Sequence, residues 1–100
     1  MSDERQTVRY TVDPTHPALP GHFPGNSVVP AVLLVRFVAQ TVESLGYSLF
    51  AIDKMKFVRP VRPGETVDVT VTLLSGAQGS VEIEANGIPV ASGLWRYTRA

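Results

Sequence analysis

The stretch PAVLLVRFVAQTVESLG, residues 30–46, decides the fold of this 100-residue protein. It is typical of a helix, because Pro30 suits the first helical position and Gly46 suits the C-terminal stop. Its apolar residues would cover most of the circumference of that helix: Ala31, Val32, Leu33, Leu34, Val35, Phe37, Val38, Ala39, Val42 and Leu45. A helix that is apolar nearly all round is normally buried. We therefore expect a sheet that wraps around it.

The segments on either side of this helix alternate with a period of two, which predicts strands. The predicted strands are residues 7–12, 50–57, 66–74, 80–85 and 88–97. Inward-facing side chains are expected at Val8, Tyr10, Val12, Val67, Val69, Val71, Leu73, Val81, Ile83 and Ala85. Asn86-Gly87 is a strong signal for a two-residue hairpin. Pro89 favours an edge position or the opening of the last strand.

The order of one strand, one helix and four further strands with short connections predicts an α+β fold with mostly antiparallel neighbours. A central helix wrapped by such a sheet is the architecture of a hot dog fold. We expect residues 1–100 to form a single domain of this kind. Because a small domain with 44% hydrophobic residues often buries part of them against a second copy, we also expect a dimer that joins two sheets.

Composition and charge exclude several classes of function. Nine basic and nine acidic residues give a formal net charge of zero, so no global field attracts nucleic acid. The absence of cysteine excludes a disulfide framework, a zinc–thiolate site and a thiol nucleophile. The first residues, MSDERQTVRY, do not resemble a signal peptide, and the longest apolar run, Val28–Val35, is too short to span a bilayer. We expect a soluble cytoplasmic protein that binds no metal.

His22 lies in the loop GHFPGNSVVP, residues 21–30, directly before the predicted helix. The simpler interpretation is a loop histidine that donates to a backbone carbonyl. The functional interpretation is a general base beside a helix N-terminus, where Val29 at the expected cap position has no side-chain oxygen to occupy the free N–H groups. The N–H groups of Ala31 and Val32 would then be available to a carbonyl or an oxyanion. A base beside such donors is what proton abstraction next to a thioester carbonyl requires.

The polar residues of the helix form one narrow stripe, since Arg36, Gln40, Glu43 and Tyr47 are spaced by four, three and four positions. The stripe is either a solvated seam with local charge pairing or the lining of a cleft, and the spacing fits both. The guanidinium of Arg36 is expected to reach solvent or to meet a carboxylate, for which Glu43 is one candidate.

Two blocks of the sequence resemble the signatures of one known family. The stretch LPGHFPGNSVVPAVLLVRFVAQ, residues 19–40, resembles that of the 3-hydroxyacyl-carrier-protein dehydratases of fatty-acid synthesis, a hot dog family. Their pattern is a histidine followed by Phe-Pro-Gly, then Pro-Gly-Val-Leu, an acidic residue and Ala-Gln. The stretch IDKMKFVRPVRPGETVDVTV, residues 52–71, is similar to the second block, an isoleucine–aspartate strand that leads to an Arg-Pro-Val-x-Pro-Gly turn. The short length also resembles that of small dehydratase-like proteins of aryl-polyene and related polyketide pathways.

The resemblance implies roles for the residues that match the pattern. His22 matches the catalytic histidine, and Gln40 matches the glutamine at the end of the motif. Ala31 replaces the glycine whose backbone N–H holds the thioester carbonyl, and alanine keeps that N–H. Arg36 stands where the family has its catalytic acid, and arginine cannot protonate the leaving hydroxyl because it stays charged at any working pH. The implied substrate-binding residues are Phe23, Gly25, Ala31 and Val32.

The implied function is the reversible loss of water from a 3-hydroxyacyl thioester, which gives a 2-enoyl thioester without a cofactor. In this family the site is built across a dimer, with the histidine from one chain and the acid from the other. Arg36 therefore leaves three outcomes open: a homodimer that uses His22 with a water on Gln40, a heterodimer with a homologous subunit that supplies the acid, or a non-catalytic protein that binds an acyl chain. A hot dog thioesterase is less favoured, because the histidine loop is of the dehydratase type.

Four of the nine basic residues fall within nine positions: Lys54, Lys56, Arg59 and Arg62. One interpretation is a solvated strand edge on which lysines discourage aggregation. The other is a docking patch for acyl carrier protein, the acidic partner that the resemblance implies, with its phosphopantetheine-linked acyl chain. Trp95 and Tyr97, on one face of the last strand, are expected to be core or dimer contacts.

Overall fold

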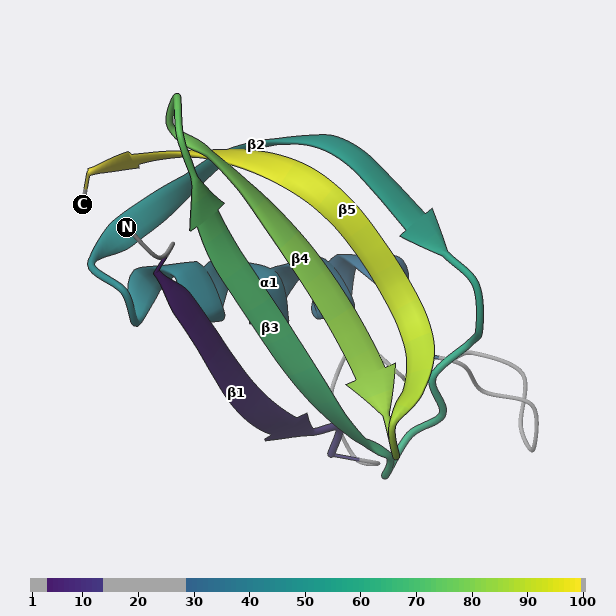
Figure 1. Ribbon diagram of the computed structural model, residues 1–100. Coiled ribbons are helices and arrows are strands. Elements are labelled where there is room, and N and C mark those ends of the chain that lie inside the picture. Colours follow the sequence, from purple (N-terminus) through teal and green to yellow (C-terminus); the bar gives the residue numbers. More distant parts are fainter. Residues whose placement is uncertain (1–3, 14–28, 100) are drawn as a thin grey trace.

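The computed structural model describes residues 4–13 and 29–99 of the chain. Its elements are β1 (Arg5–Thr11), α1 (Ala31–Glu43), β2 (Tyr47–Phe57), β3 (Thr66–Leu74), β4 (Gln78–Ala85) and β5 (Ile88–Arg99). These strands form one antiparallel sheet in the order β1-β3-β4-β5-β2. The sheet curves around α1, with β1 and β2 at its edges (Figure 1). The predicted α+β hot dog fold is confirmed.

The predicted strands are present, and several are longer than the sequence pattern indicated. β3 has the predicted bounds, whereas β2 begins at Tyr47 and β5 continues to Arg99. These two ends pair with each other, so the hydrogen bonds of the ladder extend both strands beyond their alternating segments.

The hairpin between β4 and β5 is confirmed. Asn86 and Gly87 have φ angles of 55° and 77°, as a type I′ turn requires at both central residues. Of the two positions predicted for Pro89, the strand opening is correct and the sheet edge is wrong, because β5 lies between β4 and β2. A register shift between Ile83 and Glu84 accompanies the proline.

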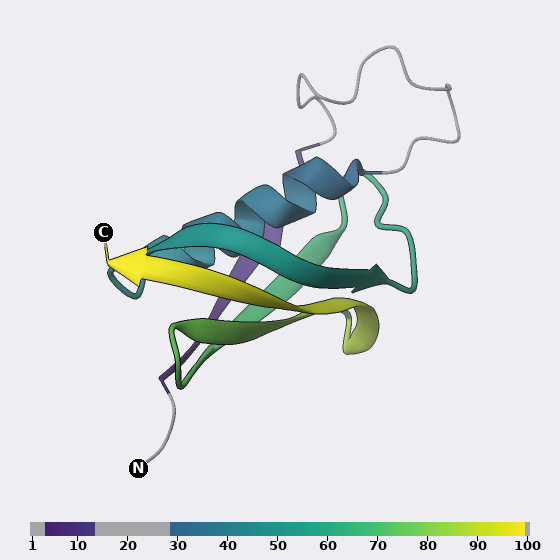
Figure 2. The same ribbon diagram turned by 90° about the horizontal axis from the view of Figure 1, so that it is seen from above.

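Helix α1 is buried on one face only. Its buried side chains are Leu33, Leu34, Val38, Thr41 and Val42. Val32, by contrast, is 72% exposed, and Arg36, Gln40 and Glu43 are exposed as well. A single curved sheet covers one side of a helix (Figure 2), so the prediction of burial all round is wrong for one copy of the chain.

The helix also begins and ends slightly inside the predicted bounds. Its N-cap is Pro30 and not Val29, and Pro30 offers no side-chain hydrogen bond. After Glu43, a turn carries the chain to Gly46, whose φ of 90° favours glycine.

The core lies between α1 and the inner face of the sheet. The predicted inward side chains of β3 and β4 are all buried, as is Trp95 of β5. Thr41 is the only buried polar residue in the described part of the chain, and its hydroxyl lies 2.8 Å from both the Phe37 carbonyl oxygen and the Tyr10 hydroxyl. The Tyr10 ring stacks on that of Phe37 at 4.4 Å between centroids. These contacts join α1 to β1.

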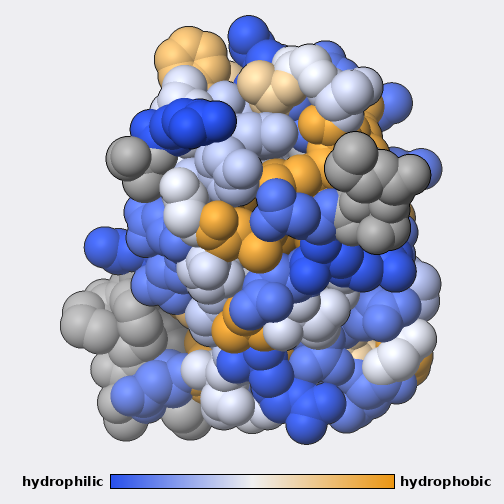
Figure 3. Space-filling model, turned by 60° about the vertical axis from the view of Figure 1, so that its left-hand side comes forward, coloured by the Kyte–Doolittle hydropathy of each residue, from blue (hydrophilic) through white to orange (hydrophobic). Residues whose placement is uncertain are grey.

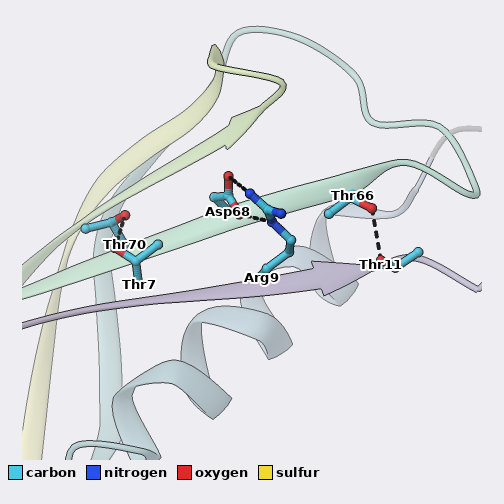
Figure 4. A network of polar contacts seen from close by, with 6 residues as sticks. All are labelled: Thr7, Arg9, Thr11, Thr66, Asp68 and Thr70. Carbon is cyan, nitrogen blue, oxygen red and sulfur yellow. Dashed lines mark hydrogen bonds and ion pairs between the residues drawn. The ribbon is translucent and has the colours of Figure 1, made fainter.

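The outer face of the sheet is polar where β1 pairs with β3 (Figure 4). Two threonine pairs, Thr7 with Thr70 and Thr11 with Thr66, flank the ion pair of Arg9 and Asp68 at 2.9 Å. The hydrogen bond from Arg9 holds the pKa of the Asp68 carboxyl below its usual value. The face in Figure 3 likewise shows apolar surface only in small patches among polar side chains. In β3 and β4, strict alternation therefore separates core from solvent.

Replacing Gly79 with alanine should lower the free energy of unfolding by about 1–3 kcal/mol, as overpacking of a core does. Gly79 of β4 faces Trp95 of β5, and a Cβ at this position would clash with the indole ring. Chemical denaturation would measure the change. Ser80→Ala, at the next position and on the outer face, is the matched control and should change stability by less than about 0.5 kcal/mol. A Gly79→Ala variant as stable as the control would show that the indole can move aside.

Candidate active site

A pocket of about 450 Å³ opens where α1 begins and the chain leaves β2. One wall comes from Val29, Ala31 and Leu34, and the other from residues 57–61. The Val29 N–H donates to the Val61 carbonyl oxygen at 2.7 Å, so a backbone hydrogen bond holds the two walls together. The lining is mainly apolar, which suits an acyl chain or another weakly polar ligand.

The first turn of α1 presents N–H donors that have no partner among the described residues, and it begins beside this pocket. The Leu33 N–H donates to the Pro30 carbonyl oxygen at 3.0 Å. Within the described residues, the N–H groups of Ala31 and Val32 have no acceptor, because Pro30 cannot cap them. Of these two residues, Ala31 lines the pocket and Val32 does not, so one of the predicted donors lies at a cavity that a carbonyl group could enter.

Arg59 and Glu65 form a polar corner on the opposite wall. The Arg59 Nη2 lies 3.4 Å from Glu65 Oε2, and its Nη1 donates to the Pro60 carbonyl oxygen at 3.3 Å. The Arg62 backbone N–H donates to Glu65 Oε1 at 2.7 Å. That backbone hydrogen bond is the main reason why the pKa of Glu65 lies below its usual value, and Arg59 lowers the pKa further.

The helix stripe faces away from the sheet. Arg36, Gln40 and Glu43 are exposed, while Tyr47 is partly buried and its ring packs against that of Tyr97. In the described residues, Arg36 forms no ion pair, so Glu43 is not its partner. Neither Arg36 nor Gln40 lines the pocket at the start of α1. In one copy of the chain, the stripe is a solvated seam.

The four basic residues predicted to form a docking patch lie in three different places. Lys54 and Lys56 are exposed on the outer face of β2, where they border a shallow groove that also contains Glu82. Arg59 instead lines the pocket and is ion-paired. Arg62 is exposed in the loop between β2 and β3. Trp95 is a core residue, as predicted, because its side chain is fully buried.

The remaining predicted residues, His22, Phe23 and Gly25, lie outside the residues that the structure describes. Sequence reasoning missed Phe57, Val58 and Glu65 as parts of the site. The Arg-Pro-Val-Arg-Pro-Gly turn, residues 59–64, could have indicated them, because it belongs to the second block of the family resemblance, but the sequence analysis gave that turn no role.

Among the described residues, no cluster of histidine and carboxylate side chains could hold a metal ion. Within the same residues, every helix is too short or too polar to cross a membrane.

Comparison with known families gives a match over nearly the whole chain. The family of ApeI-like dehydratases (ApeI dehydratase) matches residues 1–93. The protein therefore belongs to the ApeI-like dehydratase family. The dehydratase resemblance seen in the sequence is confirmed by this match.

Individual relatives agree with the family. The chain is 40% identical over 83 residues to the 3-hydroxyacyl-[acyl-carrier-protein] dehydratase FabZ of Oenococcus oeni, a match that covers 73% of this chain and 60% of that protein. It is 34% identical over 92 residues to the FabZ of Ehrlichia chaffeensis, with 84% and 64% covered. The chain thus spans less than two thirds of the length of these relatives.

A solved structure supports the fold. The dehydratase heterocomplex ApeI:P from Xenorhabdus doucetiae superposes with a TM-score of 0.80 at 21% identity, covering 99% of this chain and 97% of that chain. At this identity the likeness concerns the fold alone, which is the hot dog fold described above.

Proposed function

We propose that this protein takes part in the reversible dehydration of a 3-hydroxyacyl thioester carried by acyl carrier protein. The observation that carries the proposal is the family match over residues 1–93, which includes the His22 loop. The two relatives named above are 3-hydroxyacyl-[acyl-carrier-protein] dehydratases. The pocket beside Ala31 supports it, because a thioester carbonyl there would meet free N–H groups within apolar walls.

In the proposed reaction, His22 takes a proton from the carbon next to the thioester carbonyl. The N–H groups of Ala31 and Val32 stabilise the negative charge that develops on the carbonyl oxygen. The electron pair then forms the carbon–carbon double bond as the hydroxyl group departs from the neighbouring carbon. That hydroxyl must receive a proton to leave as water. The products are a 2-enoyl thioester and water, with no net oxidation or reduction and no need for a redox cofactor.

The source of that last proton is the point on which the candidates differ. Arg36 cannot supply it, because a guanidinium group does not act as a general acid. In a homodimer, a water held by Gln40 would be the donor. In a heterodimer, a homologous subunit would supply an acid, and the similarity to a protein of a dehydratase heterocomplex favours this second candidate. A non-catalytic acyl-binding subunit is the remaining alternative, and the test of His22 below addresses it.

The proposed partner surfaces follow from exposure and charge. Strand β2 is a sheet edge and carries Phe50, which is 64% exposed, so we propose that dimers form along this edge. Lys54 and Lys56 are exposed beside that edge and are the proposed contacts for an acidic acyl carrier protein in the cytoplasm. Arg62 is a third exposed cation on the loop that follows.

Replacing His22 with alanine should lower dehydratase kcat about 10²- to 10⁴-fold, the usual contribution of a general base. The assay is hydration or dehydration of carrier-linked 3-hydroxyacyl substrates by the purified protein and by its complex isolated from native cells. Turnover that survives the change would refute His22 as the base. If neither preparation of the unaltered protein turns over any chain length, the acyl-binding alternative is favoured.

Replacing Arg36 with glutamate should raise the dehydratase activity of the homodimer about 10²-fold or more, if the missing general acid limits the reaction. The matched control is Arg36→Gln, which removes the charge without adding an acid and should leave activity near that of the unaltered homodimer. A folded Arg36→Glu dimer with equal or lower activity would indicate that arginine belongs to a working site.

Reversing the charge of Lys56 with glutamate should slow association with acyl carrier protein and weaken its dependence on salt. Stopped-flow association rates across a range of ionic strength measure both effects. Arg5→Glu makes the same change of net charge at the opposite edge of the sheet and should alter the rate less. Equal rates and salt dependence for the two variants would return Lys56 to the role of a solvated edge residue.

A further inference from the structure

Arg59 is the only charged side chain among the described residues that line the pocket at the start of α1. Its side chain is 32% exposed. The Nε atom is buried and has no hydrogen-bond partner within the described part of the chain. A buried donor without an acceptor is uncommon in folded proteins and calls for an explanation.

The two hydrogen bonds that Arg59 forms are long and therefore weak. Its contacts to Glu65 and to the Pro60 carbonyl oxygen are long, at 3.4 and 3.3 Å. The stronger hydrogen bond of Glu65, at 2.7 Å, comes instead from the Arg62 backbone N–H. Glu65 therefore orients Arg59 and balances its charge. Because a guanidinium has five N–H donors, this contact still leaves the Nε–H without an acceptor.

The charge balance indicates what kind of ligand would complete the corner. A second anion beside Arg59 would be repelled by the Glu65 carboxylate, whose lowered pKa keeps it ionised at neutral pH. A neutral acceptor, such as an amide carbonyl oxygen, meets no such repulsion and would pair the buried Nε–H. The pocket walls around Arg59 are otherwise apolar, which suits a chain with isolated amide groups.

We propose that Arg59 is a substrate-binding residue that donates its Nε–H to an amide carbonyl of the pantetheine arm. This inference rests on the proposed function, because it takes the substrate to be a pantetheine thioester, and it names the residue that recognises the arm. Arg59 then acts inside the pocket, and Lys54 and Lys56 act outside it on the carrier protein. The charge cluster of the sequence thus has two separate roles.

The test compares Arg59→Met with Lys56→Met on one 3-hydroxyacyl group presented in three ways: on acyl carrier protein, on free pantetheine and on a simple alkyl thiol without amides. Arg59→Met should raise KM about 10-fold or more for the first two substrates, the usual effect of losing a hydrogen bond from a charged donor, with kcat little changed. The KM of the amide-free thioester should not respond to Arg59. The effect of Lys56→Met should be confined to the carrier-linked substrate.

A rise in KM that Arg59→Met produces only with carrier protein would make Arg59 a docking residue and overturn the proposal. An equal rise for the amide-free thioester would assign it a structural role and also overturn the proposal. Arg59→Lys keeps the charge but lacks Nε–H, so it should reproduce the effect of Arg59→Met if the methionine variant does not fold.

Binding without turnover separates this inference from the proposed reaction. Calorimetry with 3-hydroxyacyl-pantetheine should give a Kd that Arg59→Met raises about 10-fold, even if no dehydration occurs. In that case the dehydratase proposal fails and the role of Arg59 stands. If dehydration occurs and Arg59→Met changes neither Kd nor KM, this inference is refuted and the proposed reaction stands. A protein that does not bind acyl-pantetheine would also refute this inference.

Discussion

The packing of one apolar face of α1 against the curved sheet is the constraint on which the rest of the structure depends. Leu34, Val38 and Val42 press onto a layer of valines that β3 supplies at every second position. Burial of this apolar surface is the main source of stability in a chain without disulfides. The Thr41 hydroxyl, which hydrogen-bonds with Tyr10, fixes the helix relative to β1.

The same packing creates the candidate site. Because the sheet holds α1 along its inner face, the first turn of the helix lies beside the segment that follows β2, and the Val29–Val61 hydrogen bond joins them. The pocket therefore forms between an uncapped helix start and a wall that contains Arg59. A helix start that lacks a side-chain cap is poor for helix stability, but it leaves N–H groups available to a ligand. A side-chain cap would have occupied these donors.

Ion pairing differs between the outer face of the sheet and the open side of α1. On the outer face, Arg9 pairs with Asp68 and Arg96 pairs with Asp53, so these ions are partnered in solvent, where each pair contributes little stability. On the open side of α1, Arg36 has no such partner in the described residues. Val32, one turn before it, is 72% exposed, so charged and apolar surface lie together on this open side in one copy of the chain.

The sequence by itself determined the fold class, the order of the elements and most of the core, because periods of two and of 3.6 residues encode which side chains turn inward. It also determined the family, since the His22 loop and the Arg-Pro-Val-x-Pro-Gly turn are local motifs. Only the tertiary structure decided which face of α1 the sheet covers, because an apolar circumference does not say how far one sheet reaches. Likewise, only the structure separated Arg59 from Lys54 and Lys56. Lys54 and Lys56 lie on β2, which ends at Phe57, whereas Arg59 lies beyond the strand. There it lines the pocket and forms an ion pair with Glu65.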